Sequence, residues 1–161
     1  MIGKATPEDC LDLAALSLQV WLQTYATQGL RETISRYALS TFTERYFQQL
    51  LNEPAVEIWV ARKEEHLVGY VAVDLGSNFN GKAHGYQVTT LYVSEHYQGQ
   101  GIGRQLLDTV KNQYGLPYWL SVWVKNDLAI NFYTRLGFRL IGELDFNLSG
   151  ELHQNQVFSR S

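Results

Sequence analysis

Three glycines at alternating positions stand between a strand-like segment and a helix-like one. The stretch reads Gln98-Gly99-Gln100-Gly101-Ile102-Gly103-Arg104. Residues 87–93 before it are rich in β-branched and aromatic side chains, and after it apolar residues recur at the spacing of one helical face as far as Tyr114. A glycine turn that opens a helix presents bare backbone N–H groups to an anion, and the helix dipole adds to the attraction. We therefore expect this turn to bind a phosphate or pyrophosphate.

A second block combines an amide, a small residue and a phenol. It reads Asn126-Asp127-Leu128-Ala129-Ile130-Asn131-Phe132-Tyr133-Thr134-Arg135-Leu136-Gly137-Phe138. Asn126 suits a helix N-cap and Gly137 a helix end, which predicts a helix over residues 127–136. Ala129 and Tyr133 are four residues apart and therefore share one face of it. Tyr133 is either a functional phenol or a core aromatic beside Phe132.

Together the two blocks resemble the acetyl-coenzyme A signature of the GNAT N-acetyltransferase superfamily. Gln98-x-x-Gly101-x-Gly103, which follows Leu91-Tyr92-Val93, is similar to the cofactor motif, and the second block is similar to Asn-x-x-Ala-x-x-Phe-Tyr-x-x-x-Gly-Phe. The order of elements also matches, so the resemblance covers essentially the whole chain. The segment Trp119-Leu120-Ser121-Val122-Trp123-Val124-Lys125-Asn126 resembles, more narrowly, polyamine acetyltransferases of the PaiA kind.

The resemblance implies acetyl-coenzyme A as co-substrate and indicates which residues would bind it. Backbone N–H groups from Gln98 to Arg104 would hold the pyrophosphate, and the Arg104 guanidinium would add a charge-assisted contact. The backbone of the 91–93 strand would pair with the pantetheine arm, as an edge strand pairs with a peptide. The expected cofactor-binding residues are Leu91, Tyr92, Val93, Gln98, Gly99, Gln100, Gly101, Ile102, Gly103, Arg104, Asn126, Ala129 and Tyr133.

The implied reaction is direct transfer of acetyl to a primary amine, with Tyr133 as the catalytic acid that protonates the departing thiolate. A reference phenol has a pKa of about 10 and a thiol one of about 8.5, so that proton transfer is uphill by about 2 kcal/mol. Neutralising the amine is harder. A lysine-like amine costs roughly 4–5 kcal/mol to deprotonate at pH 7, and an α-amine about 1 kcal/mol.

The residue that would assist this deprotonation departs from the family pattern. Many members place a glutamate on the central strand as a base, whereas the aligned position here is Thr89. Gln87, two residues earlier, is no base either. Glu95, His84, His96 and an ordered chain of water molecules remain open as replacements.

The acceptor site is expected to be lined by aromatic residues from parts of the chain without a motif. Trp21, Tyr25 and Trp123 could form its walls together with Thr89, because amphipathic aromatic rings suit amine-binding clefts. The alternative for each ring is a place in the core. A small polyamine is the first expectation for the acceptor, and a peptide N-terminus or lysine is the alternative. Because Thr89 stands in place of the usual glutamate, an alternative function of another class is a module that binds acyl-coenzyme A without turnover.

The remaining reactive side chains predict no further chemistry. His66, His84, His96 and His153 lack metal-ligand spacing, so we expect them at the surface and expect no metal. The single cysteine, Cys10, excludes an intramolecular disulfide and a cysteine metal cluster. We expect it to be a buried helix residue and not a nucleophile.

Composition limits the class of protein. The 161 residues are 45% hydrophobic and 18% charged, which is typical of one globular domain. A net charge of −3 argues against a nucleic-acid partner. No signal pattern or long apolar run is present, which predicts a cytoplasmic protein without membrane association. Analogy with the superfamily predicts a monomer or homodimer.

The order of the segments predicts the fold. Strands are expected over residues 2–5, 56–61, 67–73, 87–93, 118–124, 138–148 and 152–158. Helices are expected from Thr6 to about Gly29, over 31–51 with a break near Ser40 and Thr41, over 102–114 and over 127–136. The prediction is an α/β (α+β) fold in a single GNAT-like domain, residues 1–161, with a mixed twisted sheet of about seven strands and about four helices in the order β-α-α-β-β-β-α-β-α-β-β.

Overall fold

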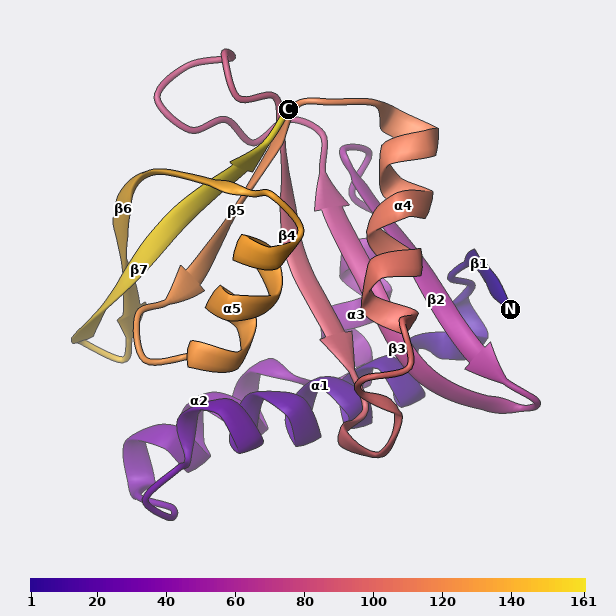
Figure 1. Ribbon diagram of the computed structural model, residues 1–161. Coiled ribbons are helices and arrows are strands. Elements are labelled where there is room, and N and C mark those ends of the chain that lie inside the picture. The colour runs from indigo at the N-terminus through magenta and orange to yellow at the C-terminus, as the bar shows by residue number, and fades with distance from the viewer.

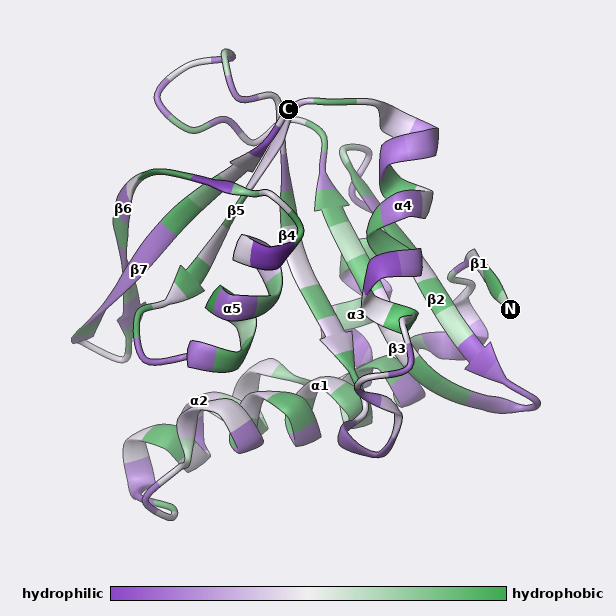
Figure 2. Ribbon diagram, in the orientation of Figure 1, coloured by the Kyte–Doolittle hydropathy of each residue, from purple (hydrophilic) through white to green (hydrophobic).

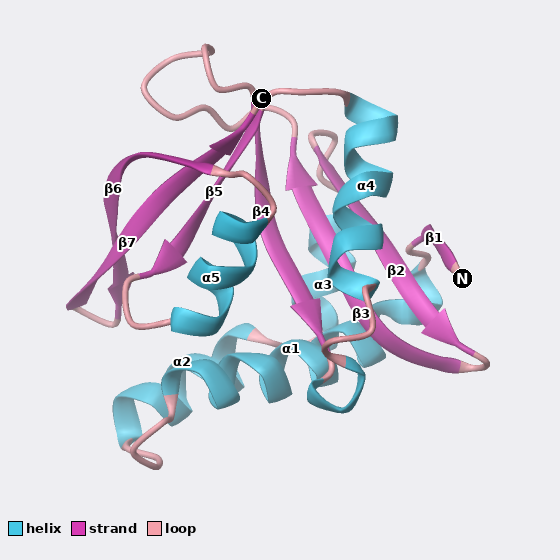
Figure 3. Cartoon of the chain, in the orientation of Figure 1, coloured by secondary structure: helices cyan, strands magenta, loops and turns pink.

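The computed structural model describes residues 1–161 and contains one sheet with helices on both faces (Figures 1 and 3). The strands are β1 (Ile2–Lys4), β2 (Val56–Lys63), β3 (His66–Asp74), β4 (Tyr86–Val93), β5 (Tyr118–Trp123), β6 (Arg139–Leu148) and β7 (Glu151–Arg160). The α-helices are α1 (Cys10–Tyr25), α2 (Glu32–Thr41), α3 (Glu44–Leu51), α4 (Ile102–Tyr114) and α5 (Asp127–Arg135), with short 3₁₀ turns at Pro7–Asp9 and Glu95–Tyr97.

The seven strands follow the order β1-β2-β3-β4-β5-β7-β6, which confirms the predicted mixed sheet. Only β4 and β5 are parallel, and they pair at just two positions, Tyr86 with Tyr118 and Gln87 with Trp119. Beyond that point the two strands diverge (Figure 1). One edge of β4 is therefore left unpaired along most of its length, in the middle of the sheet.

Three buried clusters hold the helices on the sheet, and the smallest joins α2 to α1 and β6 through Trp21, Ile34, Ala38 and Leu148. On one face α4 and α5 cover the central strands, and Leu106, Val110 and Tyr118 are fully buried there. On the other face α1 and α3 pack on β2 and β3 through side chains such as Leu13 and Phe47. Apolar residues are concentrated along the central strands in Figure 2, as a sheet covered on both faces requires.

The helices differ from the prediction in number and in one boundary. Five are present because the expected helix over 31–51 is interrupted at Phe42 and Thr43, where the Thr43 hydroxyl accepts a hydrogen bond from the Tyr46 N–H and caps α3 (3.1 Å). Helix α1 ends at Tyr25, and Gly29 closes the turn that follows, with its N–H bonded to the Ala26 carbonyl. None of the helices combines the length and apolar character that crossing a membrane would need.

The N-terminus of α1 is fixed to the sheet by a buried carboxylate. As predicted, the helical segment begins after Thr6, and Asp9 accepts a hydrogen bond from the Thr6 N–H (2.8 Å). The other oxygen of Asp9 pairs with the Arg62 guanidinium on β2. Burial alone would raise the pKa of Asp9, but the Thr6 N–H and Arg62 outweigh it and hold that pKa below its ordinary value.

Candidate active site

The glycine turn forms an anion cradle at the start of α4. Gly99 and Gly101 have φ values of 79° and 83°, a left-handed conformation that favours glycine. The first backbone bond of the helix runs from the Gln105 N–H to the Gly101 carbonyl (3.0 Å), so the N–H groups from Gly99 to Arg104 have no backbone partner. A Cβ at Gly99 would meet no atom within 4 Å, which leaves open space beside this row of donors.

Gln98 stabilises the turn, whereas the sequence predicted that its backbone N–H would bind the pyrophosphate. Its N–H is already bonded to the Glu95 carbonyl (3.4 Å), and its side-chain amide donates to the Val93 carbonyl (3.1 Å). The row of free donors therefore begins at Gly99, and Gln98 holds the turn against the end of β4. The Arg104 side chain is exposed in the first turn of α4, where it can reach an anion.

Gly103 serves packing. A Cβ here would lie 3.3 Å from Cζ of Phe132 on α5 and 3.8 Å from Cδ2 of Leu91 on β4. The close neighbour of the Gly103 backbone is therefore a ring of the protein itself. The missing side chain lets α4, α5 and β4 meet at the mouth of the unpaired edge.

The unpaired edge of β4 exposes the backbone of Leu91 and Val93. The Ser94 N–H donates to the Val68 carbonyl (2.8 Å), so Ser94 and, by alternation, Tyr92 direct their backbone groups toward β3. Leu91 and Val93 consequently direct theirs to the other side, where no strand pairs. The Val93 carbonyl is occupied by Gln98, and the remaining groups are free to pair with an extended ligand.

A β-bulge interrupts β4 at the aligned base position. Ala72 of β3 is paired with Thr90 and Val73 with Val88, so Thr89 has no partner across the ladder. Its hydroxyl donates to the Ala72 carbonyl (3.2 Å). Because of the bulge, Thr89 and Thr90 line the same cavity although they are consecutive, while Gln87 is held away by a bond with Ser77 (2.8 Å).

This cavity, of about 240 Å³, lies between α3 and the strands β3 and β4. Its lining is mainly apolar and phenolic, and consists of Phe42, Tyr46, Phe47, Leu50, Val56, Tyr70, Ala72, Asp74, Thr89, Thr90 and Tyr92. Burial raises the pKa values of the three phenols, Tyr46, Tyr70 and Tyr92, so these groups remain protonated and neutral. Asp74 is the one carboxylate in the lining, and sequence reasoning missed it because no motif marks the end of β3.

Helix α5 carries the second block as predicted. The Asn126 side-chain oxygen caps the helix by accepting from the Ala129 N–H (3.3 Å), which leaves its amide N–H groups for a ligand. Tyr133 is 7% exposed and lies between Phe132 and Phe138, with ring centroids 5.2 and 5.1 Å away. It shares one core cluster with Val88 of β4, and Ala129 and Leu91 pack against the same cluster.

The protonation of Tyr133 is set by its surroundings. Burial, with a smaller contribution from Tyr118, raises the pKa of Tyr133 above its ordinary value. The group is therefore a protonated donor throughout the neutral range. It is also a weaker acid than a reference phenol, so proton transfer to a thiolate costs more than the 2 kcal/mol or so expected from reference values.

The three predicted acceptor aromatics form a continuous stack. Tyr25 lies between Trp21 and Trp123, with both centroid distances 4.6 Å. Trp21 is 3% exposed and belongs to a small core with Ile34, so it is chiefly structural. Tyr25 and Trp123 are half-buried, and none of the three rings lines the cavity that contains Thr89.

His153 lies only partly at the surface, because its ring is 5.7 Å from Trp123 and its side chain is 20% exposed. The same region contains a residue that sequence reasoning missed. Asn155 of β7 is paired with Trp123 in the sheet, and its buried side-chain oxygen has no hydrogen-bond partner. A donor on a bound molecule would satisfy it.

The replacements considered for the base lie outside the cavity. Glu95 and His96 are exposed on the 3₁₀ turn beyond Val93, and Thr89 is four residues of strand, roughly 13 Å, from that end of β4. His84 packs near Phe79 in the loop before β4 (6.3 Å). None of the three lines the cavity that contains Thr89.

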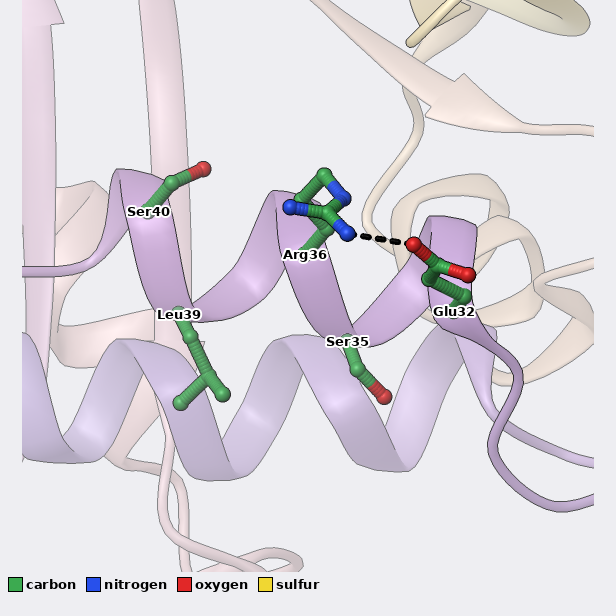
Figure 4. Close-up of a pocket in the computed structure, with 5 residues that line it drawn as sticks. All are labelled: Glu32, Ser35, Arg36, Leu39 and Ser40. Carbon is green, nitrogen blue, oxygen red and sulfur yellow. Dashed lines mark hydrogen bonds and ion pairs between the residues drawn. The ribbon is translucent and has the colours of Figure 1, made fainter.

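A second hollow, of about 450 Å³, is unrelated to this chemistry. Figure 4 shows that its lining residues, among them Glu32, Arg36 and Leu39, all come from the single helix α2. The two charged residues pair with each other. It is a shallow surface feature without a free reactive group.

Comparison with known proteins agrees with this geometry. The model of the acetyltransferase (GNAT) family matches residues 21–138. The chain belongs to this family. The match includes both sequence blocks and β4, so the chain is an N-acetyltransferase, and its glycine turn and unpaired strand edge lie within the matched region.

The individual relatives share a third or less of their aligned residues with this chain. An uncharacterized N-acetyltransferase of Mycobacterium tuberculosis is 27% identical over 151 residues, which cover 91% of this chain and 93% of the relative. The spermine/spermidine N(1)-acetyltransferase of Bacillus subtilis is 33% identical over 94 residues, 52% of this chain and 60% of that protein. The PaiA N-acetyltransferase of Thermoplasma acidophilum, solved in complex with coenzyme A, has a TM-score of 0.72 at 20% identity and covers 96% of each chain.

Proposed function

We propose that the protein transfers acetyl from acetyl-coenzyme A to a primary amine, with small polyamines as the first acceptor class. The observation that carries this proposal is the continuity of three features along β4. Free N–H groups from Gly99 to Arg104 begin the path, the unpaired backbone of Leu91 and Val93 continues it, and the cavity at Thr89 ends it. Pyrophosphate, pantetheine and thioester would occupy these features in that order.

The proposed reaction uses an amine in this cavity together with Tyr133 of α5, which is not among the cavity's lining residues and belongs to the core on the other face of the sheet. The amine nitrogen attacks the thioester carbonyl carbon, the new C–N bond forms, and the C–S bond breaks. Tyr133, which burial keeps protonated, donates its proton to the leaving thiolate. Arg104 and the N-terminus of α4 hold the charged end of the co-substrate away from the reacting centre.

Two observations favour a polyamine acceptor. The Bacillus subtilis relative and the Thermoplasma acidophilum structure are a polyamine acetyltransferase and a PaiA protein by their names. The cavity also combines phenolic rings with one carboxylate, Asp74, and aromatic faces with an anion attract ammonium groups. A peptide N-terminus or a lysine side chain remains the alternative acceptor.

The test is release of free coenzyme A thiol from acetyl-coenzyme A in the presence of a panel of acceptors. The panel contains spermidine, spermine, a simple alkylamine, a peptide with a free N-terminus and an N-blocked lysine peptide. We expect the highest kcat/KM with the polyamines. Turnover of the peptides alone would contradict the polyamine proposal and identify a peptide amine as the acceptor. Cofactor binding without turnover of any member would contradict the enzyme and favour the non-catalytic binding module.

A further inference from the structure

The bulged segment of β4 lacks the carboxylate that would accept a proton from the amine, and one neighbouring strand supplies a carboxylate in the same space. Asp74, the last residue of β3, lines the cavity together with Thr89 and Thr90. The other titratable groups there are the phenols Tyr46, Tyr70 and Tyr92, from α3, β3 and β4, and burial keeps all three neutral. No histidine, lysine, arginine or second carboxylate lines this cavity.

The position of Asp74 corresponds to the end of the proposed co-substrate path. Asp74 is paired across the ladder with Gln87, which is itself one of the two positions where β4 pairs with β5. The unpaired edge begins immediately beyond this point. An arm that starts at the turn after β4 and runs along Leu91 would end here. Neighbouring cross-strand positions lie about 5 to 8 Å apart, within reach of a direct contact or of one bridging water.

The carboxylate of Asp74 is available for this contact. One oxygen accepts a hydrogen bond from the Gly76 N–H (2.9 Å), which holds the side chain in a local turn. None of the ion pairs of the protein involves Asp74. Asp74 is therefore a carboxylate without a cationic side-chain partner, at the end of a cavity whose other lining residues are uncharged.

We propose that Asp74 takes the place of the missing strand glutamate and accepts the proton that the acceptor nitrogen loses. This inference rests on the proposed acetyl transfer. As the C–N bond forms, one N–H bond breaks and its proton passes to the carboxylate, directly or through one water. The C–S bond breaks and the thiolate takes a proton from Tyr133. Solvent then restores both side chains, so the net change is amine plus thioester to amide plus thiol.

The first variant, Asp74→Asn, removes the charge and keeps the turn, because the asparagine oxygen can still accept from Gly76. We expect kcat to fall by about 10²-fold or more, with coenzyme A affinity and melting temperature unchanged. The matched control is Asp145→Asn, an exposed aspartate on β6 outside the cavity, which should retain wild-type kcat. Wild-type kcat in Asp74→Asn would overturn the proposal.

The second variant, Asp74→Ala, separates proton transfer from a positioning or binding role. The smaller side chain leaves room for a small carboxylate. Added formate should therefore raise the kcat of Asp74→Ala at least tenfold and leave the kcat of Asp74→Asn unchanged. A rise in KM without rescue by formate would assign Asp74 to binding of the ammonium group and contradict its role as proton acceptor. A wild-type protein that turns over no amine would instead refute the acetyl transfer itself, and the inference would fail with it.

Discussion

At the scale of single residues, the proposed mechanism assigns the two proton transfers to two unlike groups. Tyr133 is a buried phenol on α5 whose raised pKa keeps it protonated, which suits a donor. Asp74 is an unpaired carboxylate on β3, which suits an acceptor. Thr89, at the aligned base position, instead bonds the Ala72 carbonyl and stabilises the bulge. The residue at the aligned base position therefore stabilises the backbone of β4 and has no side chain that could act as a base.

Replacement of Tyr133 by phenylalanine tests the donor. The ring keeps its packing against Phe132 and Phe138, so we expect stability and coenzyme A affinity to remain near wild type. Loss of the hydroxyl should lower kcat by about 10²-fold. Steady-state kinetics with spermidine, together with isothermal titration of coenzyme A, would measure both. Tyr114→Phe is the matched control, since Tyr114 ends α4, about 18 Å of helix from Ile102. Wild-type kcat in Tyr133→Phe would contradict the proposal that Tyr133 donates the proton to the thiolate.

At the scale of elements, features set by local sequence could be predicted and those set by partners across the sheet could not. The positive φ values at Gly99 and Gly101 and the cap at Asn126 follow from residue type and position. The bulge at Thr89 depends on the register with β3, and the cavity depends on where α3 lies, so no spacing in the sequence indicates either. The place of Asp74 in the cavity lining could not be predicted either, because it depends on the same register and the same helix.

The contact between α1 and β2 gives a prediction at this scale. The pKa of Asp9 is depressed in the folded state, so its ionised form stabilises folding. That contribution is fully present above the unfolded-state pKa of about 3.9 and is lost as the pH falls through the lower folded-state pKa. Asp9→Asn should lower the free energy of unfolding by about 1–2 kcal/mol at pH 7, since Arg62 is partly screened by solvent.

Urea unfolding of wild type and Asp9→Asn between pH 2.5 and 7 measures this contribution. The difference between the two proteins should shrink below about pH 4, because Asp9 of the unfolded chain is protonated there first and Asp9 of the folded chain follows at its lower pKa. Asp12→Asn, an exposed aspartate in the first turn of α1, is the control and should change stability less. A difference that stays constant down to pH 2.5 would contradict an electrostatic origin.

At the scale of the whole molecule, the sheet consists of two parts joined at a fork. Strands β1 to β4 form one part and β5, β7 and β6 the other, and only the two β4–β5 residue pairs join them within the sheet. Helix α4 packs on β3 and β4, while Tyr133 of α5 shares its core cluster with both sides of the fork. A ligand that fills the unpaired edge would add contacts where the sheet itself has none.

Coenzyme A should therefore stabilise the folded protein measurably without any acceptor amine. At a free concentration of one hundred times Kd, binding to the folded state alone adds about 2.7 kcal/mol, which corresponds to a rise in Tm of roughly 5–10 °C for a chain of this length. Thermal unfolding at increasing coenzyme A concentration measures the rise. Pantetheine, which lacks the pyrophosphate, should produce a much smaller one, because the N–H groups from Gly99 to Arg104 would stay unoccupied. Equal shifts with the two ligands would show that the glycine turn contributes nothing, and no shift with either would place the cofactor elsewhere.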